Sequence, residues 1–216
     1  MNFEEIYKKC KGYTVTSYER MKSLYEVVVL VNDKNLDGDY VECGVYMGGS
    51  IMNMAYTQLN YAKKVHIHLY DTFEHMTPPT EVDKDYKGIS AFELLKNEQY
   101  MCIYSLRQVV LNMKKTGYPE NFLHYHKGDV AKTLLEDVPE KVSVLRMDTD
   151  WYESTKIELE VLYPKIVSGG FLIIDDYGHF VGCKKATDDY FKKIGVDPLF
   201  KQIDYTGVLH VKGSRV

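Results

Sequence analysis

Two pairs of aspartates are the first candidates for chemistry, because each pair follows an apolar run. Asp175 and Asp176 end the run GGFLII, and Asp148 and Asp150 follow the run VSVLRM. A carboxylate that loses its water needs a cation or several donors beside it, or it takes up a proton. Several carboxylates without Cys or His ligands suit Mg²⁺, which prefers oxygen. The pattern predicts a bound cation, although Asp is also common in turns and at helix N-termini.

A glycine-containing loop follows the first predicted strand, DYVEC at 39–43. Gly44 and Gly48 allow tight turns and the close approach of a ligand, and Ser50 can cap the next helix. The loop is not the dinucleotide fingerprint G-x-G-x-x-G, because Glu42 stands in place of its first glycine. An acid there repels pyrophosphate but can bind the ammonium group of an amino acid.

Asp71 ends the second predicted strand and follows Gly49 by 22 residues. This is the position from which an acid binds ribose hydroxyls in nucleotide-binding α/β folds. The loop and the acid together describe a site for a nucleoside with a cationic amino-acid tail. S-adenosylmethionine fits that description better than a nicotinamide cofactor.

Short apolar runs alternate with helical stretches along almost the whole chain. This alternation indicates an α/β fold with a parallel sheet, helices on both faces and ligands at the carboxyl ends of the strands. Two last runs, PLFKQIDY and VLHVKG, predict a terminal β-hairpin that adds an antiparallel strand. The other predicted strands cover 39–43, 65–71, 121–129, 142–148 and 170–175, and the main predicted helices cover 16–33, a stretch from Ser50, about 90–115, 152–163 and 183–194.

Length and composition indicate one globular domain, 1–216, with a helical N-terminal segment at 1–38. The chain is 45% hydrophobic, its net charge is −4, and it has no Lys/Arg-rich stretch, so nucleic acid is not an expected partner. It has no apolar run of membrane-spanning length and no basic leader, so we expect a cytoplasmic protein without a membrane partner. The Pro-containing stretch at 74–90 is the candidate lid over the bound substrate.

Cysteines and histidines give no sign of a zinc site. Cys10, Cys43, Cys102 and Cys183 are widely spaced without C-x-x-C, so we expect reduced thiols. His66 and His68 share one strand face and His124 and His126 another. Because neither strand offers a third ligand, both histidine pairs are expected to be structural.

Four stretches of the chain resemble the macrocin/mycinamicin-type S-adenosylmethionine-dependent O-methyltransferases. The stretches are YVECGVYMGGS, YDTFEHM, LRMDTDWYESTKIELEVLYPKIVSGGFLIIDDY and CKKATDDYF, which cover most of 40–191. The resemblance implies a Rossmann-like class I methyltransferase fold with a mostly parallel seven-stranded sheet. It also implies transfer of a methyl group to a hydroxyl of a sugar or glycosylated small molecule, with S-adenosylmethionine and Mg²⁺ as cofactors.

The resemblance also implies roles for individual residues. Asp148, Asp175 and Asp176 are the implied metal ligands. The predicted cofactor-binding residues are Glu42, Cys43, Gly44, Val45, Gly48, Ser50, Asp71, Thr72, Phe73, Gly128 and Asp129.

Asp150 is the first candidate for the base that takes the acceptor's proton. In an extended strand it would point the same way as Asp148, which is expected to bind the metal. In the alternative interpretation Asp150 only caps the helix that follows, and His179 is then the next candidate for the base.

Two other functional classes share parts of this pattern. A nicotinamide-dependent oxidoreductase would use the sheet and Asp71 but would leave Asp148 and the aspartate pair without a role. A non-catalytic Rossmann-like binding module would not need the metal-binding acids. The expected partner is a small molecule with hydroxyl groups, and the sequence leaves the oligomeric state open, a homo-oligomer included.

Overall fold

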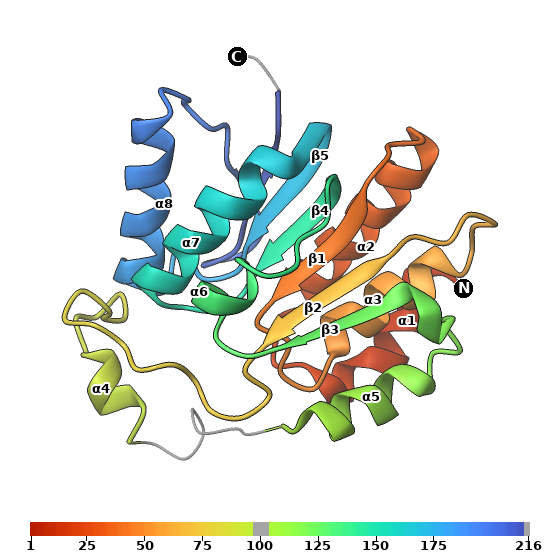
Figure 1. Cartoon of the computed structure of the whole chain (residues 1–216), viewed down its shortest axis with the longest axis horizontal. Helices are drawn as coiled ribbons and strands as arrows, with labels where there is room; N and C mark the ends of the chain where they lie inside the picture. Colours follow the sequence, from red (N-terminus) through yellow and green to blue (C-terminus); the bar gives the residue numbers. More distant parts are fainter. Residues whose placement is uncertain (97–103, 214–216) are drawn as a thin grey trace.

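A computed structural model describes residues 1–96 and 104–213. Within these residues the chain forms a seven-stranded sheet with the strand order β3-β2-β1-β4-β5-β7-β6 (Figure 1). The strands are β1 (Asp39–Cys43), β2 (Ile67–Asp71), β3 (Leu123–Lys127), β4 (Val142–Met147), β5 (Ile166–Ile174), β6 (Lys201–Gln202) and β7 (Val208–Val211).

The sheet is parallel from β3 to β5 and antiparallel at its β7 edge. β1 pairs in parallel with β2 and β4, β2 with β3, and β4 with β5. β7 runs antiparallel to both β5 and β6. The predicted fold class, including the terminal hairpin, is therefore confirmed.

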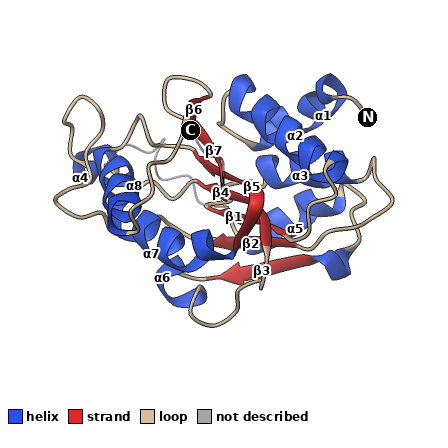
Figure 2. Ribbon diagram, turned by 90° about the horizontal axis from the view of Figure 1, so that it is seen from above, coloured by secondary structure: helices blue, strands red, loops and turns tan. Residues whose placement is uncertain are grey.

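Helices cover both faces of the sheet (Figures 1 and 2). The short α4 (Ala91–Leu94) lies apart from both layers. On one face lie α1 (Phe3–Cys10), α2 (Tyr18–Asp33), α3 (Gly49–Gln58) and α5 (Leu106–Lys114). On the other face lie α6 (Val130–Thr133), α7 (Tyr152–Leu162) and α8 (Val181–Lys193). Three short 3₁₀ turns complete the described part of the chain: Lys11–Tyr13, Glu120–Phe122 and Tyr163–Lys165.

Alternation along each strand divides the buried side chains between two cores. In β5, Phe171 and Ile173 belong to the core under α1–α3 and α5, whereas Leu172 and Ile174 belong to the core under α6–α8. Successive side chains of a strand point to opposite faces, so each strand contributes to both layers. The same alternation decides on which side of the sheet a polar residue at a strand end lies.

The predicted elements differ from the observed ones mainly at their ends. α2 begins after Ser17, whose hydroxyl accepts the Arg20 N–H at 3.1 Å, so the helix predicted over 16–33 is confirmed. β5 begins at Ile166 instead of 170. The helix predicted around 90–115 is represented by α4 and α5, and its middle at 97–103 lies outside the described residues.

Two further expectations can be compared with the structure. Cys10, Cys43 and Cys183 are buried free thiols, and Cys102 lies outside the described residues. None of the helices in the described ranges is long and apolar enough to cross a membrane.

The histidines of β2 and β3 pair with each other across the two strands. Nδ1 of His66 lies 2.8 Å from Nε2 of His124, and Nδ1 of His68 lies 3.1 Å from Nε2 of His126. The ring of His126 also stacks on Tyr70, with 4.0 Å between the centroids. Burial, followed by the neighbouring His68, lowers the pKa of His126 to about 4.

This lowered pKa predicts how His126 contributes to stability as pH changes. His126 takes up a proton near pH 6.5 in the unfolded chain but only near pH 4 in the folded chain. Its contribution to the unfolding free energy is therefore fully present above about pH 6.5 and is lost as the pH falls toward 4. Between pH 7 and 5, wild type should lose about 2 kcal/mol more unfolding free energy than His126→Gln. Urea denaturation at both pH values measures this, with the exposed His75→Gln as control. Equal losses in wild type and His126→Gln would contradict it.

Candidate active site

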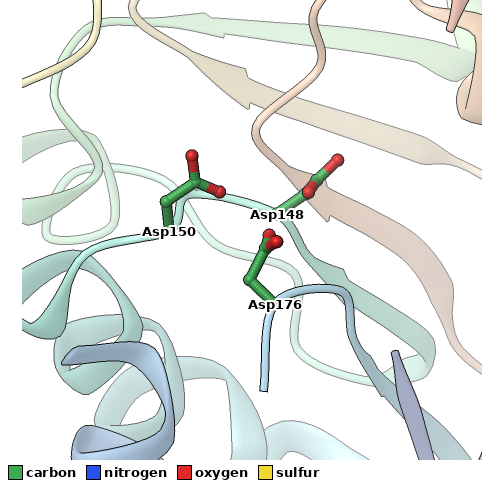
Figure 3. A group of neighbouring side chains, drawn as sticks. All are labelled: Asp148, Asp150 and Asp176. Atoms are coloured by element: carbon green, nitrogen blue, oxygen red, sulfur yellow. The ribbon is translucent and has the colours of Figure 1, made fainter. Parts of the chain in front are cut away.

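Three carboxylates converge where β4 and β5 end. Asp148 and Asp176 follow these strands, and Asp150 lies on the turn before α7 (Figure 3). One oxygen from each carboxylate lies within 4.8 Å of the others, a spacing that could hold a metal ion. In 1–96 and 104–213, no other three His, Cys, Asp or Glu side chains meet in this way.

A tight turn brings Asp150 to this group. The prediction relied on an extended strand, but β4 ends at Met147, so Asp148 and Asp150 are not two residues of one strand. Asp150 has a φ of +69°, and the Trp151 N–H donates to the Thr149 carbonyl at 2.8 Å. A left-handed backbone costs a non-glycine residue about 1–2 kcal/mol, so surrounding contacts must hold this turn in place.

Burial makes the negative charge of these acids costly. Burial, opposed by a hydrogen bond from Asp176 and helped by the charge of Asp148, raises the pKa of Asp150 to about 7. Burial, and then the charge of Asp150, hold the pKa of Asp176 well above its ordinary value. A proton or a cation must therefore compensate the cluster.

Arg146 lies beneath the cluster with a side chain only 2% exposed. Its Nη1 lies 2.5 Å from Oε1 of Glu42 and 2.8 Å from Oδ2 of Asp148. Its Nη2 donates to Oδ1 of Asp175 at 2.6 Å. Glu42 is opposite Arg146 in the β1–β4 register, so one guanidinium links acids from three neighbouring strands.

Asp175 is oriented differently from its predicted role as a metal ligand. One of its oxygens accepts from Arg146 and the other from Arg20 of α2. Alternation along β5 explains this, because Asp175 continues the side of Ile173 and Asp176 the side of Ile174. The structure thus brings Asp150, and not Asp175, together with Asp148 and Asp176.

Arg20 connects this cluster to the C-terminal hairpin. Its Nε donates to Oδ2 of Asp204 at 2.9 Å, and Ser17 donates to the same oxygen at 2.7 Å. Asp204 also accepts the backbone N–H groups of Thr206 and Gly207 at 3.0 and 2.8 Å. Sequence reasoning missed both arginines, although an arginine within the apolar run VSVLRM was a visible signal for Arg146.

Asp71 braces the glycine loop on the other side of the site. Its carboxylate accepts the backbone N–H groups of Val45 and Phe73, both at 2.6 Å. Gly44 has a φ of +83°, and a Cβ there would overlap the backbone carbonyl of Asp148. Gly44 therefore lets the loop after β1 approach the end of β4.

A cavity of about 570 Å³ lies between this loop and the acidic cluster. Its size is within the range of small-molecule sites. It also has Arg20, Tyr205 and residues 74–77 in its wall. The predicted site residues that line it are Gly44, Val45, Asp71, Thr72, Gly128, Asp148, Asp150, Asp175, Asp176 and His179.

Three predicted cofactor residues lie outside this lining because their side chains face the protein interior. Glu42 is fully buried and bound to Arg146. Cys43 belongs to the core under α6–α8, and Phe73 to the core on the opposite face. The prediction that they contact the cofactor is not supported by this geometry.

The other three predicted residues outside the lining lie at helix N-termini. Gly48 is the N-cap of α3, with a φ of +90°. Ser50 lies inside α3 with its hydroxyl 3.9 Å from the sulfur of Met21, so it does not cap the helix as predicted. Asp129 caps α6 by accepting the Ala131 N–H at 3.0 Å.

His179 lies in the cavity wall beside aromatic side chains. Its Nδ1 is 3.3 Å from the hydroxyl of Tyr205, and its ring centroid is 5.3 Å from that of Tyr86. Burial lowers the pKa of His179, so the ring is neutral at neutral pH and can accept a proton.

Comparisons with known proteins agree on one family. The family model for macrocin-O-methyltransferase (TylF) matches residues 8–212. The 8-demethyl-8-(2,3-dimethoxy-alpha-L-rhamnosyl)-tetracenomycin-C 4'-O-methyltransferase of Streptomyces olivaceus is 32% identical over 91% of this chain and 74% of its own length. The mycinamicin III 3''-O-methyltransferase of Micromonospora griseorubida is 28% identical over 91% of this chain and 77% of its own.

A solved structure agrees with this match. The O-methyltransferase NovP superimposes with a TM-score of 0.83 at 28% sequence identity, and the match covers 93% of this chain and 82% of NovP. The likeness therefore extends over nearly the whole fold.

The central ion pairs predict a large effect of Arg146→Leu on stability. The substitution leaves Glu42 and Asp175 buried without their shared partner, which should cost about 3–5 kcal/mol of unfolding free energy. Urea denaturation measures this loss. The exposed Arg107→Leu on α5 is the matched control and should change stability by no more than about 0.5 kcal/mol. Similar losses for both variants would refute the central role of Arg146.

Proposed function

The chain belongs to the macrocin O-methyltransferase family, and we propose that it transfers the methyl group of S-adenosylmethionine to a sugar hydroxyl with the help of Mg²⁺. The observation that carries this proposal is the convergence of Asp148, Asp150 and Asp176 on a cavity bordered by the loop that Asp71 braces. Family membership makes the chain an O-methyltransferase and replaces the oxidoreductase and the non-catalytic binding module considered from the sequence.

S-adenosylmethionine is proposed to bind between the glycine loop and β2. Gly44, Val45, Asp71 and Thr72 line this part of the cavity. Each oxygen of Asp71 accepts a backbone N–H at 2.6 Å and has a longer second contact at 3.4 Å, with the Tyr46 N–H or the Thr72 hydroxyl. A ribose hydroxyl is proposed to take the place of the longer contact. When bound, S-adenosylmethionine supplies an electrophilic methyl group, and the chain's own residues orient that methyl group toward the acidic cluster.

Mg²⁺ is proposed to bind at the acidic cluster. The donor set fits this ion, because it consists of carboxylate oxygens, and a cation would compensate the charge that burial makes costly. When bound, the cation stabilises negative charge on an acceptor oxygen. Asp148 and Asp176 belong both to the observed group of carboxylates and to the set of ligands that the family resemblance implies. The two differ only in the third carboxylate, Asp150 or Asp175.

Two side chains in the cavity wall can take the acceptor's proton. The pKa of Asp150 is raised to about 7 by burial, close to the pH at which a general base works best. We assign the proton first to Asp150, which applies where Asp175 is the third metal ligand. Where Asp150 itself binds the cation, the positive charge lowers its pKa and the base is His179. His179 is the second candidate, since its ring is neutral at the same pH.

The proposed acceptor is a sugar or a glycosylated small molecule. The Streptomyces olivaceus relative is named for methylating a rhamnosyl-tetracenomycin, and the Micromonospora griseorubida relative for methylating mycinamicin III. Tyr86, His179 and Tyr205 form an aromatic group at the cavity that suits the apolar face of a sugar ring. Assays of labelled methyl transfer to a panel of rhamnosides and other glycosides test this acceptor class.

Cofactor binding should stabilise the folded chain. S-adenosylmethionine at 100 times its Kd should add about 2.7 kcal/mol to the unfolding free energy, and NAD should add nothing. Asp71→Ala should reduce this effect, whereas the exposed Asp197→Ala, outside the cavity wall, should preserve it. Thermal denaturation with each ligand provides the measurement. Stabilisation by NAD alone would refute the cofactor assignment.

The acidic cluster predicts which aspartates bind the metal. Asp148→Asn and Asp176→Asn should each weaken Mn²⁺ binding by at least about tenfold, as measured by calorimetry. In the observed arrangement Asp150→Asn should do the same and Asp175→Asn should not, because arginines hold both oxygens of Asp175. The exposed Asp188→Asn on α8 is the control.

If Asp175→Asn weakens Mn²⁺ binding and Asp150→Asn does not, the third ligand is Asp175, as the family resemblance implies. Asp150 would then be free to act as the base, and Asp150→Asn should lower kcat by about 10²–10⁴ at unchanged metal affinity. If none of the four substitutions at Asp148, Asp150, Asp175 and Asp176 changes Mn²⁺ binding, the proposed metal site is refuted.

A further inference from the structure

The segment between β2 and α4 includes the candidate lid at 74–90, and part of it is fixed to the start of α7. The indole N–H of Trp151 donates to the Thr77 carbonyl at 2.9 Å. The backbone N–H of Tyr152 donates to Oδ1 of Asp83 at 2.8 Å. Lys84 is also tied to α8, because its carbonyl accepts the Val181 N–H at 2.8 Å. Residues 77–84 are therefore a docked wall of the site, and closure of the rest of the segment over an acceptor stays a prediction.

Asp83 is the most buried acid of this segment, with 0% exposure. Its second oxygen accepts the Thr80 N–H at 2.7 Å and the Thr80 hydroxyl at 2.8 Å. Its carbonyl accepts the Ala91 N–H at 2.9 Å. A buried carboxylate needs such donors, and the partial positive charge at the N-terminus of α7 stabilises it further.

Asp83 supplies what the sequence around α7 lacks. The N-cap residue of α7 is Trp151, whose side chain makes no capping hydrogen bond. Asp83, 69 residues earlier in the chain, accepts the N–H of the first helical residue instead. Asp150 is therefore not the cap of α7. The N-cap residue is Trp151, and the carboxylate at the start of the helix is that of Asp83.

The packing of α8 leaves room for this contact. A Cβ on Gly182 would overlap Oδ1 of Asp83 and lie 3.1 Å from the Tyr152 nitrogen. Gly182 belongs to α8, where alanine is a better helix former than glycine by about 1 kcal/mol. A loss of order in Gly182→Ala would therefore come chiefly from displacing Asp83, because the Tyr152 nitrogen needs to shift by only a few tenths of an ångström.

We propose that Asp83 is a positioning residue that holds the turn carrying Asp150 in the acidic cluster. The residues that follow Asp150 are Trp151 and Tyr152, and both are bonded to the 77–83 segment. Because that segment also lines the cavity through Thr77, its docking and the geometry of the cluster depend on each other. This inference rests on the proposed function of the cluster as the metal and proton site.

The first test uses the metal-free protein. The chain has one tryptophan, so its indole N–H gives a single reporter signal, and the Tyr152 amide reports the contact with Asp83 directly. In Asp83→Ala and Gly182→Ala, hydrogen exchange at both groups should be at least about tenfold faster than in wild type. Asp83→Asn keeps one acceptor for the Tyr152 N–H but loses the oxygen that accepts from Thr80, so its exchange rates should lie between those of wild type and Asp83→Ala. Glu81→Ala, exposed in the same segment, is the control.

The second test measures Mn²⁺ binding by calorimetry. Misplacing a residue that orients a ligand typically costs 10–100-fold in metal affinity, so we expect about tenfold or more for Asp83→Ala and Gly182→Ala. In the Asp83→Ala background, Gly182→Ala should cause less than about twofold further loss, because the side chain that it displaces is gone. If Asp83→Ala fails to fold, Gly182→Ala carries both tests.

The outcomes separate this inference from the proposed function. Faster exchange with weaker Mn²⁺ binding supports the positioning role. Faster exchange with unchanged Mn²⁺ binding would limit Asp83 to capping α7 and would overturn the positioning role. Unchanged exchange in Asp83→Ala and Gly182→Ala would overturn it as well. Wild type that binds no Mn²⁺ would contradict the proposed metal site, and the exchange data alone would then decide whether Asp83 holds the turn.

Discussion

A single guanidinium, that of Arg146, is shared by Glu42 in β1, Asp148 after β4 and Asp175 after β5. Arg146 cannot balance three negative charges alone. Arg20 contributes a second positive charge at Asp175. Burial raises the pKa of Glu42, and the charge of Arg146 opposes this effect. One oxygen of Glu42, Oε2, has no hydrogen-bond partner among the described residues.

This charge balance separates two sets of acids at one edge of the sheet. Glu42 and Asp175 face the arginines and are compensated by the protein itself. Asp150 and Asp176 face the cavity, and the described arginines do not pair with them. Asp148 belongs to both sets, because it contacts Arg146 and also meets the other two carboxylates. The protein's own arginines thus compensate Glu42 and Asp175, whereas the charges of Asp150 and Asp176 are left for a bound ligand to compensate.

Much of the fold was predictable from the sequence, because strand and helix periodicity and the acids at the strand ends are local signals. β1 was predicted at its observed bounds, and the terminal hairpin was predicted by its two apolar runs. The contacts that organise the site were not local. Arg146 meets Glu42 across 104 residues, Arg20 meets Asp175 across 155, and Asp83 meets Tyr152 across 69. Cys43 and Phe73 were predicted at the cofactor because proximity in sequence cannot show which face of the sheet a side chain occupies.

The contact between Arg20 and Asp204 also has a consequence for biosynthesis. Arg20 lies near the N-terminus of the chain, and Asp204 lies in the hairpin whose strand β7 pairs with β5. A nascent chain on the ribosome can form the parallel strands and most helices before Asp204 has been synthesised. Until then Arg20 lacks one of its acids, and the edge of β5 has no neighbour. An exposed strand edge favours pairing with other chains, so a growing polypeptide of this kind is most vulnerable to aggregation just before the hairpin emerges.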